Sequence, residues 1–491
     1  MPPSFPASNP LAPDWLRQPD DANALSANLW PASTARNAAG ELMIGGLSAT
    51  DLASEFGTPL YVIDEADACA RAAELRSVFE REFARVGTTV GVYYAAKAFL
   101  STQVARWMAD AGLNIDICSG GELAVALAAG VEPGRLGFHG NNKSIPEIDE
   151  ATRIGLGAIV IDSAIEIDRV AAAATRHGRV QAVRLRVNSG VHAHTHEFLA
   201  TSHEDQKFGI TLDDAPGLVA AIRAEPALRF LGLHCHIGSQ IFGADGFAES
   251  ASRLLAVHAA LLESGPVPEL NLGGGFGIAY TDTDTPTPIG ELASRLADIV
   301  ASECAARGIP LPRVAFEPGR FIIGPAGLTL YSVGTTKAVE VTREAGTATR
   351  LYVSVDGGMS DNVRPALYGA DYAVRLANRT SDTEPALVRI AGKHCESGDI
   401  VVNADYLPGD VTPGDLVAVP ATGAYCWSLS NNYNYLGRAP VVAVRQAGAR
   451  LLIRGETTAD LLDRDTGVAE TRTTRPAASA RQPSDMKDTT R

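Results

Sequence analysis

A lysine at the end of an apolar run is the first residue whose type and place indicate chemistry. Lys97 closes the stretch Tyr94-Ala-Ala-Lys97, which has the character of a buried strand. A lysine there must reach a cavity, and desolvation favours the neutral, nucleophilic amine that forms Schiff bases. The alternative is a surface lysine whose stem covers the strand while its ammonium group reaches water.

A run of three glycines, Gly273, Gly274 and Gly275, follows another predicted strand. Because glycine has no Cβ, its backbone N–H can approach an anion closely, as phosphate sites do in the late loops of α/β barrels. The run alone is equally typical of a mobile turn. Together with a Schiff-base lysine at the same end of the fold, it indicates pyridoxal phosphate (PLP) as a cofactor.

Two further strand ends carry groups that suit this cofactor. Glu317 and Arg320 flank a Pro-Gly turn, and a carboxylate there could keep a pyridine nitrogen protonated. The alternative is a surface ion pair of little energetic consequence. His236 could stack on a cofactor ring or be a hydrogen-bonded histidine of the core, which is the usual state of a lone histidine.

These residues need a scaffold, and the chain supplies one from about residue 88 onward. Short apolar runs alternate with Ala- and Leu-rich segments of helical period. The predicted strands are Val90–Ala96, Asn114–Cys118, Arg135–His139, Ala158–Asp162, Ala182–Val187, Phe230–Ile237, Glu269–Leu272 and Arg313–Glu317. Continuous apolar strands of this kind are buried on both faces, so eight β/α units predict a TIM barrel rather than an open sheet.

After Gly324 the pattern changes to strand-like runs with hardly any helix, which predicts a C-terminal all-β domain. The expected fold class is α/β, a PLP-binding (β/α)8 barrel with this second domain. The predicted boundaries are a loosely ordered extension (1–40), strands that join the β domain (41–65), the barrel (66–325), the β domain (326–465) and a disordered tail (466–491).

Composition narrows the function classes. The 491 residues carry a net charge of −15, and the pI is near 5.2, which argues against nucleic acid or an anionic membrane as the main partner. No apolar run is long enough to cross a membrane, and no secretory signal is recognisable. The six cysteines are scattered and form no C-x-x-C pair, which favours reduced thiols in a cytoplasmic protein.

A metal site is not expected. His192, His194 and His196 alternate as metal ligands could, but a structural zinc usually needs four ligands and no partner cysteine is evident. A polar loop at the barrel rim is the simpler interpretation. Whether Asp116 or His139 has a remote role toward a cofactor stays open at this point.

The motifs also carry a family resemblance. Tyr94-Ala-Ala-Lys97, His236-Ile-Gly-Ser-Gln240, the glycine run and Glu317-Pro-Gly-Arg320 resemble the alanine racemase/ornithine decarboxylase group of PLP enzymes, which have fold type III. Within that group, Cys395-Glu-Ser-Gly-Asp399, Asp361 to Tyr368 and Gly423-Ala-Tyr425 are similar to the diaminopimelate decarboxylase family. The resemblance runs from about Gly46 to Gly437 with the motifs in order.

The resemblance implies a homodimer with active sites shared between subunits, and a role for each matching residue. Lys97 would carry PLP as a Schiff base, and His236 would stack on its ring. The phosphate would be held by Gly273, Gly274, Gly275, the backbone around Gly319, and Ser239. Glu317 would pair with the pyridine nitrogen, while Tyr425 would contact cofactor and substrate. Arg320, Arg364 and Tyr368 would bind the distal carboxylate of the substrate. Cys395, as proton donor, and Glu396, which reads the distal ammonium group, would come from the neighbouring subunit.

The chemistry of these residues suits meso-diaminopimelate, which loses CO2 to give L-lysine in the last step of the diaminopimelate route. Two arginines and a tyrosine suit a distal carboxylate, which ornithine and arginine lack. An alanine racemase would use a tyrosine as its second acid/base and has no use for the Cys395-Glu396 loop. A non-catalytic PLP carrier made of a single barrel would need no second domain.

Overall fold

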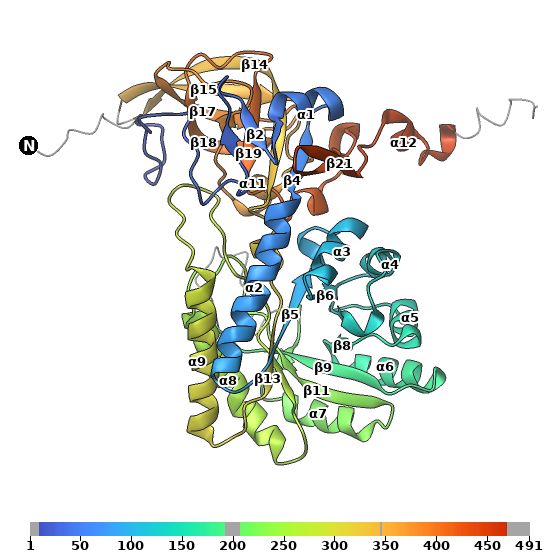
Figure 1. Cartoon of the computed structure of the whole chain (residues 1–491). Coiled ribbons are helices and arrows are strands. Elements are labelled where there is room, and N and C mark those ends of the chain that lie inside the picture. Colours follow the sequence, from blue (N-terminus) through green and yellow to red (C-terminus); the bar gives the residue numbers. More distant parts are fainter. Residues whose placement is uncertain (1–8, 192–206, 344–345, 469–491) are drawn as a thin grey trace, which may run out of the picture.

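The computed structural model describes residues 9–191, 207–343 and 346–468, which form a barrel and a β domain (Figure 1). The helix α2 (Glu65–Arg85) runs from the β domain along the barrel. The predicted histidine cluster, His192, His194 and His196, and residues 469–491 of the predicted tail lie outside the described residues.

Eight parallel strands close into a barrel, which confirms the predicted fold class. They are β5 (Val90–Ala95), β6 (Asn114–Ile117), β7 (Leu136–Phe138), β8 (Ala158–Ile161), β9 (Gln181–Asn188), β11 (Leu228–His234), β12 (Glu269–Asn271) and β13 (Arg313–Phe316). The pairing of β13 with β5 closes the sheet, while the short β10 (Ile210–Thr211) adds to β9. Every predicted strand boundary lies within three residues of the observed one.

Helices surround the barrel on the outside (Figure 1). They are α3 (Thr102–Asp110), α4 (Gly120–Ala128), α5 (Ile145–Ile154), α6 (Ala164–Arg176), α7 (Ala215–Ala224), α8 (Asp245–Leu262) and α9 (Ile289–Arg307). Local sequence fixes their ends: Ser144 and Glu147 form a reciprocal capping box at the start of α5, and Gly308 ends α9 in the left-handed conformation.

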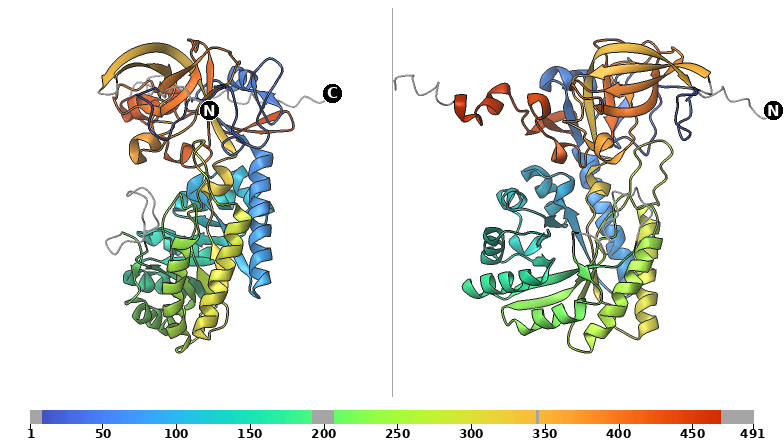
Figure 2. Two further views of the ribbon diagram at one scale, coloured as in Figure 1. Left: turned by 90° about the vertical axis from the view of Figure 1, so that its left-hand side faces the viewer. Right: turned by 180° about the vertical axis from the view of Figure 1, so that it is seen from behind.

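The β domain is a mixed sheet at one end of the barrel, seen at the top of Figure 1 and of both views in Figure 2. Its strands are β4 (Leu60–Asp64), β14 (Gly327–Arg343), β15 (Gly346–Val355), β16 (Arg375–Leu376), β17 (Pro385–Ala391), β18 (Ile400–Pro408), β19 (Leu416–Pro420), β20 (Val441–Arg445) and β21 (Gly448–Ile453). β4 comes before the barrel in sequence, yet it lies between β14 and β20. The chain therefore enters the barrel from the β domain and returns to it.

Shorter elements complete the two domains. They are β1 (Ala35–Arg36), β2 (Leu42–Ile44), β3 (Leu47–Ser48), α1 (Ala49–Phe56), α10 (Arg320–Ile323), α11 (Arg364–Tyr368) and α12 (Thr458–Leu462). Two of them, α10 and α11, begin at the arginines that the sequence analysis assigned to substrate binding.

The N-terminal segment requires a correction. We expected residues 1–40 to be loosely ordered, but Leu29 and Trp30 are buried among the side chains of the β domain. The guanidinium group of Arg375 also donates to the carbonyl of Ala24 at 2.9 Å. A few apolar anchors therefore hold residues 9–40 in place, although the segment has little regular secondary structure.

Two hydrogen bonds dock the β domain onto the barrel beside Lys97. The backbone N–H of Tyr425 and the hydroxyl of Ser428 donate to the carbonyl of Ala98, at 2.8 and 2.7 Å. The loop that carries Tyr425 therefore lies directly against the turn that carries the lysine.

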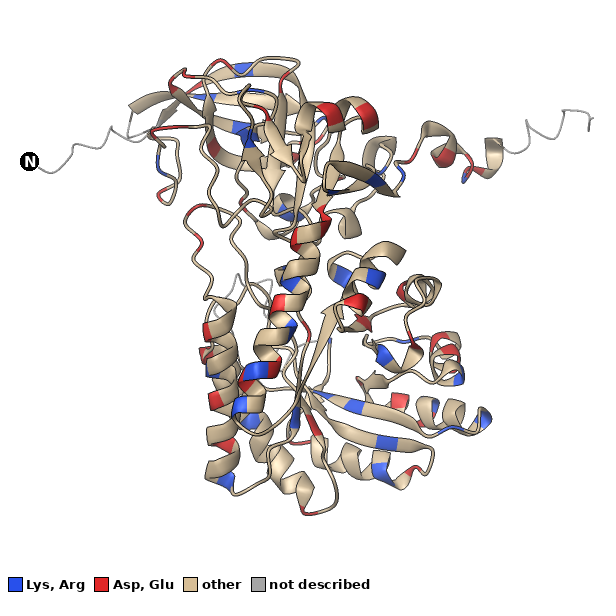
Figure 3. Ribbon diagram, in the orientation of Figure 1, with Lys and Arg blue, Asp and Glu red and all other residues tan. Residues whose placement is uncertain are grey.

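Charged residues of both signs are mixed over the outer helices (Figure 3). Among the described residues, no helix combines the length and the apolar character that a membrane span requires.

Candidate active site

A cavity of about 530 Å3 lies where the C-terminal ends of the barrel strands meet the β domain. From the barrel, its wall includes Lys97, Asp116, Cys118, His139, Arg186, His234, His236, Ser239, Glu317 and Arg320; from the β domain, it includes Arg364, Tyr368, Tyr425 and Leu429. Eight of the predicted site residues thus line one cavity. The four predicted glycines, Cys395 and Glu396 are not on its wall.

Lys97 lies in a 3-10 turn (Ala96–Ala98) that follows β5 directly. Its side chain is exposed in an otherwise buried run from Gly91 to Phe99. The turn is held because the Tyr94 hydroxyl donates to the carbonyl of Phe99 at 2.6 Å. We expected a lysine shielded from water, but Lys97 is exposed at the cavity wall.

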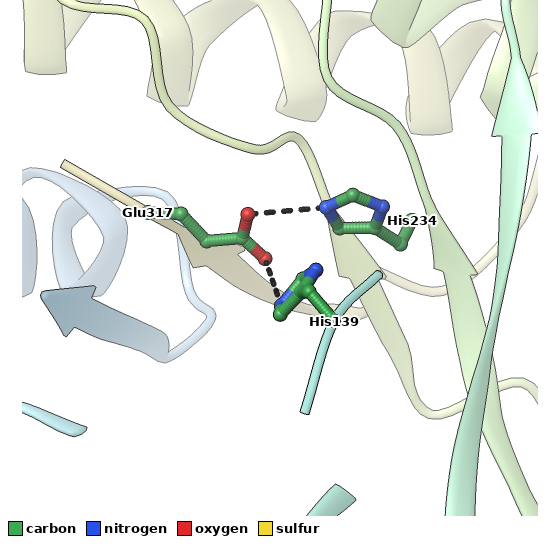
Figure 4. A group of neighbouring side chains, drawn as sticks. All are labelled: His139, His234 and Glu317. Carbon is green, nitrogen blue, oxygen red and sulfur yellow. Dashed lines mark hydrogen bonds and ion pairs between the residues drawn. The ribbon is translucent and has the colours of Figure 1, made fainter. Parts of the chain in front are cut away.

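Glu317 is buried at the end of β13 and is hydrogen-bonded on both carboxylate oxygens. Its Oε2 lies 3.1 Å from Nε2 of His234, and its Oε1 accepts from Nδ2 of Asn271 at 2.6 Å. His139 Nε2 is 3.4 Å from Oε1 and 3.2 Å from Oδ1 of Asp116 (Figure 4 shows the Glu317 contacts of both histidines). The carboxylate is therefore clamped between two imidazole rings.

The pKa values of the groups in this network are shifted in different directions. Burial lowers the pKa of His139 to about 4 and also lowers that of His234, so both rings are neutral at neutral pH. Burial acts to raise the pKa of Glu317, but His234 and His139 reverse the effect and hold it well below its usual range. Burial, reinforced by the charge of Glu317, raises the pKa of Asp116 well above normal. The cluster thus favours an ionised Glu317 beside an Asp116 that keeps its proton to a higher pH than an ordinary carboxyl group.

His139, His234 and Glu317 are also residue types that bind metals, and their ligand atoms lie within 4.8 Å of one another. The same proximity is explained by two imidazole groups facing different oxygens of one carboxylate. This is the geometry of a hydrogen-bonded carboxylate. The Glu317 carboxylate could accept a hydrogen bond from an N–H donor in the cavity as well as it could bind a cation.

The glycine run lies beneath His236. Gly273 and Gly275 have φ values of 69° and 103°, which residues with a Cβ adopt only with strain. A Cβ on Gly274 would collide with the carbonyl of Glu317. The N–H of Gly274 donates to Nδ1 of His236 at 3.2 Å, which fixes the imidazole as an acceptor on that side. Burial, followed by the charge of Lys97, lowers the pKa of His236 well below normal.

At Gly319, too, other parts of the chain approach the backbone closely. A Cβ there would lie 2.9 Å from the carbonyl of Ala95 and 3.0 Å from Cβ of Ala98. Small residues therefore let the chain at the ends of β5, β12 and β13 converge behind the residues of the cavity wall.

Arg320 and Arg364 are buried cations on the cavity wall, with side chains from opposite domains. Arg320 donates to the hydroxyl of Ser239 at 2.8 Å and to that of Tyr280. Arg364 donates to the hydroxyl of Tyr372. Among the described residues, the hydrogen-bond partners of both guanidinium groups are hydroxyls, so their charge is available to an anionic ligand.

Cys395 and Glu396 lie in the exposed loop between β17 and β18, away from the cavity wall of their own chain. The loop is anchored rather than free. The neighbouring His394 bonds to the hydroxyl of Ser360 at 2.8 Å, and Oδ1 of Asn434 accepts the N–H of Cys395 at 3.2 Å.

The roles of His139 and Asp116 could not be decided from the sequence, and several other residues of the site were given no role there. These are His234, Asn271, Arg186, Tyr280 and Tyr372. His234 and Asn271 close their strands just as Glu317 follows its own, and this position was the signal that could have found them. Tyr280 and Tyr372 gave no signal, because an aromatic residue in an apolar stretch is typical of any core.

The chain is similar to known proteins in both sequence and structure. Residues 72–324 match the family described as "Pyridoxal-dependent decarboxylase, pyridoxal binding domain". The chain is 51% identical over 446 residues to the diaminopimelate decarboxylase of Mycobacterium bovis, which covers 89% of this chain and 98% of the relative. With the diaminopimelate decarboxylase of Mycobacterium leprae it shares 50% identity over 458 residues, covering 92% and 95% of the two chains.

A solved structure extends the agreement to three dimensions. The diaminopimelate decarboxylase of M. jannaschii, in complex with L-lysine, superposes with a TM-score of 0.80 at 30% sequence identity. The match covers 90% of this chain and 98% of the other, so it includes both the barrel and the β domain.

Proposed function

The chain belongs to the diaminopimelate decarboxylases, and from this premise we propose that it converts meso-2,6-diaminopimelate to L-lysine and CO2 as the last step of lysine biosynthesis. One arrangement supports this substrate above all. The cavity that contains Lys97 also contains two buried arginines, Arg320 and Arg364, whose described hydrogen-bond partners are neutral hydroxyls. Such a pair suits the second carboxylate of a dicarboxylic amino acid.

PLP is the cofactor of this family, and the residues present fit it. Lys97 offers an exposed amine, Glu317 an ionised carboxylate, and Gly273 to Gly275 and Gly319 a backbone surface without side chains. When bound, PLP supplies an aromatic ring that accepts the electron pair left behind as CO2 departs.

Each residue of the chain then has a defined task toward this cofactor. Lys97 holds it through Nζ, and Glu317 accepts a hydrogen bond from the pyridine N–H. The His236 ring, kept neutral by burial and fixed by Gly274, would stack on the cofactor ring. The backbone of Gly273 to Gly275 and of Gly319 binds the phosphate, assisted by the Ser239 hydroxyl.

The substrate is held from the other side of the cavity. Arg320, Arg364 and Tyr368 bind the distal carboxylate, and Tyr425 contacts both cofactor and substrate. The Arg320 guanidinium lies 4.5 Å over the centre of the Tyr425 ring, so these two residues of the proposed substrate site contact each other.

The last two residues come from a second copy of the chain. We place Cys395 and Glu396 of one protomer in the cavity of its partner, in a cytoplasmic homodimer, because their loop is exposed and anchored and yet lies outside its own cavity. There Cys395 gives its thiol proton to the carbon that has lost CO2, and Glu396 accepts hydrogen bonds from the distal ammonium group.

The test is direct. The purified chain with PLP is assayed for CO2 and lysine release from meso-diaminopimelate, L-ornithine and L-arginine. We expect turnover of diaminopimelate only. Arg364→Leu should raise KM for diaminopimelate, while Arg389→Leu, at a β-domain arginine bonded to Tyr352, should not. Turnover of ornithine or arginine without turnover of diaminopimelate would refute the assignment.

A further inference from the structure

Tyr280 contacts both of the arginines that face the cavity. Its hydroxyl accepts a hydrogen bond from Arg320, and the guanidinium group of Arg364 lies 4.5 Å over the centre of its ring. Tyr280 is buried on the loop that follows β12 of the barrel. One side chain thus touches a cation from the barrel and a cation from the β domain.

The position of Tyr280 is fixed from both domains. Its backbone N–H donates to Oδ2 of Asp284 at 2.9 Å, which closes a turn in the barrel loop. Its carbonyl accepts the N–H of Ala373, a β-domain residue, at 3.2 Å. Its ring meets that of Tyr372 edge to face, with centroids 5.0 Å apart, and Tyr372 in turn accepts a hydrogen bond from Arg364.

This arrangement solves an electrostatic problem. Two guanidinium groups in one cavity repel each other, and burial removes most of the water that would screen them. An acidic side chain beside the two guanidinium groups would neutralise their charge and so weaken the binding of an anionic ligand. A phenol hydroxyl and an aromatic face stabilise a cation without cancelling its charge.

We propose that Tyr280 is a positioning residue that determines substrate specificity, because it sets the spacing of Arg320 and Arg364 for one carboxylate. This role rests on the proposed function, in which these two arginines bind the distal carboxylate of diaminopimelate. Tyr372 supports Arg364 from the other side. Tyr280 is not itself on the cavity wall and acts through the two arginines, so we expect it to affect affinity rather than the chemical step.

Three variants of the PLP-loaded enzyme separate the contributions. Tyr280→Phe removes the hydroxyl and keeps the ring under Arg364, whereas Tyr280→Leu removes both. Tyr352→Phe is the matched control, because Tyr352 accepts from Arg389 at 3.3 Å and lies 5.8 Å under its guanidinium, in the β domain and off the cavity wall.

The readouts are kcat, KM for meso-diaminopimelate, and the inhibition constants of L-lysine and cadaverine. L-lysine keeps the distal carboxylate and cadaverine has no carboxylate at all. For Tyr280→Phe we expect KM and the lysine constant to rise together by about tenfold, since a hydrogen bond to a charged group is lost. The kcat value and the cadaverine constant should stay near wild type, and Tyr280→Leu should show the larger effect.

The outcomes that contradict the role are distinct. Unchanged lysine affinity in Tyr280→Phe, an equal loss of cadaverine affinity, or an equal effect of Tyr352→Phe would overturn it. A wild-type chain that does not decarboxylate diaminopimelate would instead refute the proposed function, and this role with it.

Discussion

The ionised state of Glu317 depends on His234, and the variant His234→Phe tests that dependence. Phenylalanine keeps a ring that can pack edge-on against His139, whose centroid is 5.0 Å away, but it removes the nitrogen 3.1 Å from the carboxylate. Asn271 still donates to the other oxygen. Loss of one hydrogen bond to a charged group costs about 1.5–3 kcal/mol, so PLP should bind roughly 10- to 100-fold more weakly.

The same variant should change the pH dependence of cofactor binding. The pKa of Glu317 is depressed, so the ionised carboxylate that would bind the cofactor is present above that pKa. It is protonated, and its contribution to binding is lost, as the pH falls through that pKa. Without His234 the pKa rises, and the affinity for PLP should begin to fall at a higher pH than in the wild type.

The measurement is an absorbance titration of the apoenzyme with PLP over a series of pH values. His258→Phe is the control, because His258 is also buried and has a pKa lowered by burial to about 4, but it lies on α8. The proposed dependence of Glu317 on His234 is wrong if His234→Phe binds PLP with wild-type affinity and loses that affinity at the same low pH as the wild type. It is also wrong if His258→Phe weakens PLP binding equally.

Three further predictions concern the cofactor and the dimer. Lys97→Ala should give no borohydride-trapped PLP adduct, whereas Lys337→Ala should; a persisting adduct would identify another lysine as the anchor. Gly274→Ala should abolish PLP binding because its methyl group meets the carbonyl of Glu317, while Gly290→Ala, with open space around it, should bind PLP normally. Mixing inactive Lys97→Ala and Cys395→Ala chains should restore part of the activity measured as CO2 release, and no recovery despite subunit exchange would contradict a shared site.

The barrel could be predicted because its strands and helices are determined by short, continuous stretches of sequence. A strand buried on both faces must be apolar throughout, as Ala158–Ile161 is, and the helices between the strands carry their own caps. The sixth strand shows the limit of such a prediction, since the predicted strand continues to Ile237 while the observed strand ends at His234. There the chain leaves the sheet to bring His236 over the glycine run, and no local pattern marks that turn.

The N-terminal segment could not be predicted for a related reason. Its order comes from isolated anchors such as Leu29 and Trp30, which fit the distant β domain and have no helical or strand period. Likewise, Lys97 and Glu317 were visible as polar residues at the ends of apolar strands. Tyr280 was not, because its partners Arg320 and Arg364 lie far away in sequence and only the fold brings them together.

The partners of the buried arginines separate structural charges from functional ones. In the barrel interior, Arg184 pairs with Glu269 at 2.5 Å, and in the β domain Arg375 pairs with Asp405 at 2.9 Å. Each of those charges is cancelled within the fold. Arg320 and Arg364 are also buried, but their described hydrogen bonds go to hydroxyl groups. In a chain with a net charge of −15 carboxylates are abundant, so a cavity that surrounds its cations with phenols keeps positive charge for a ligand that brings its own carboxylate.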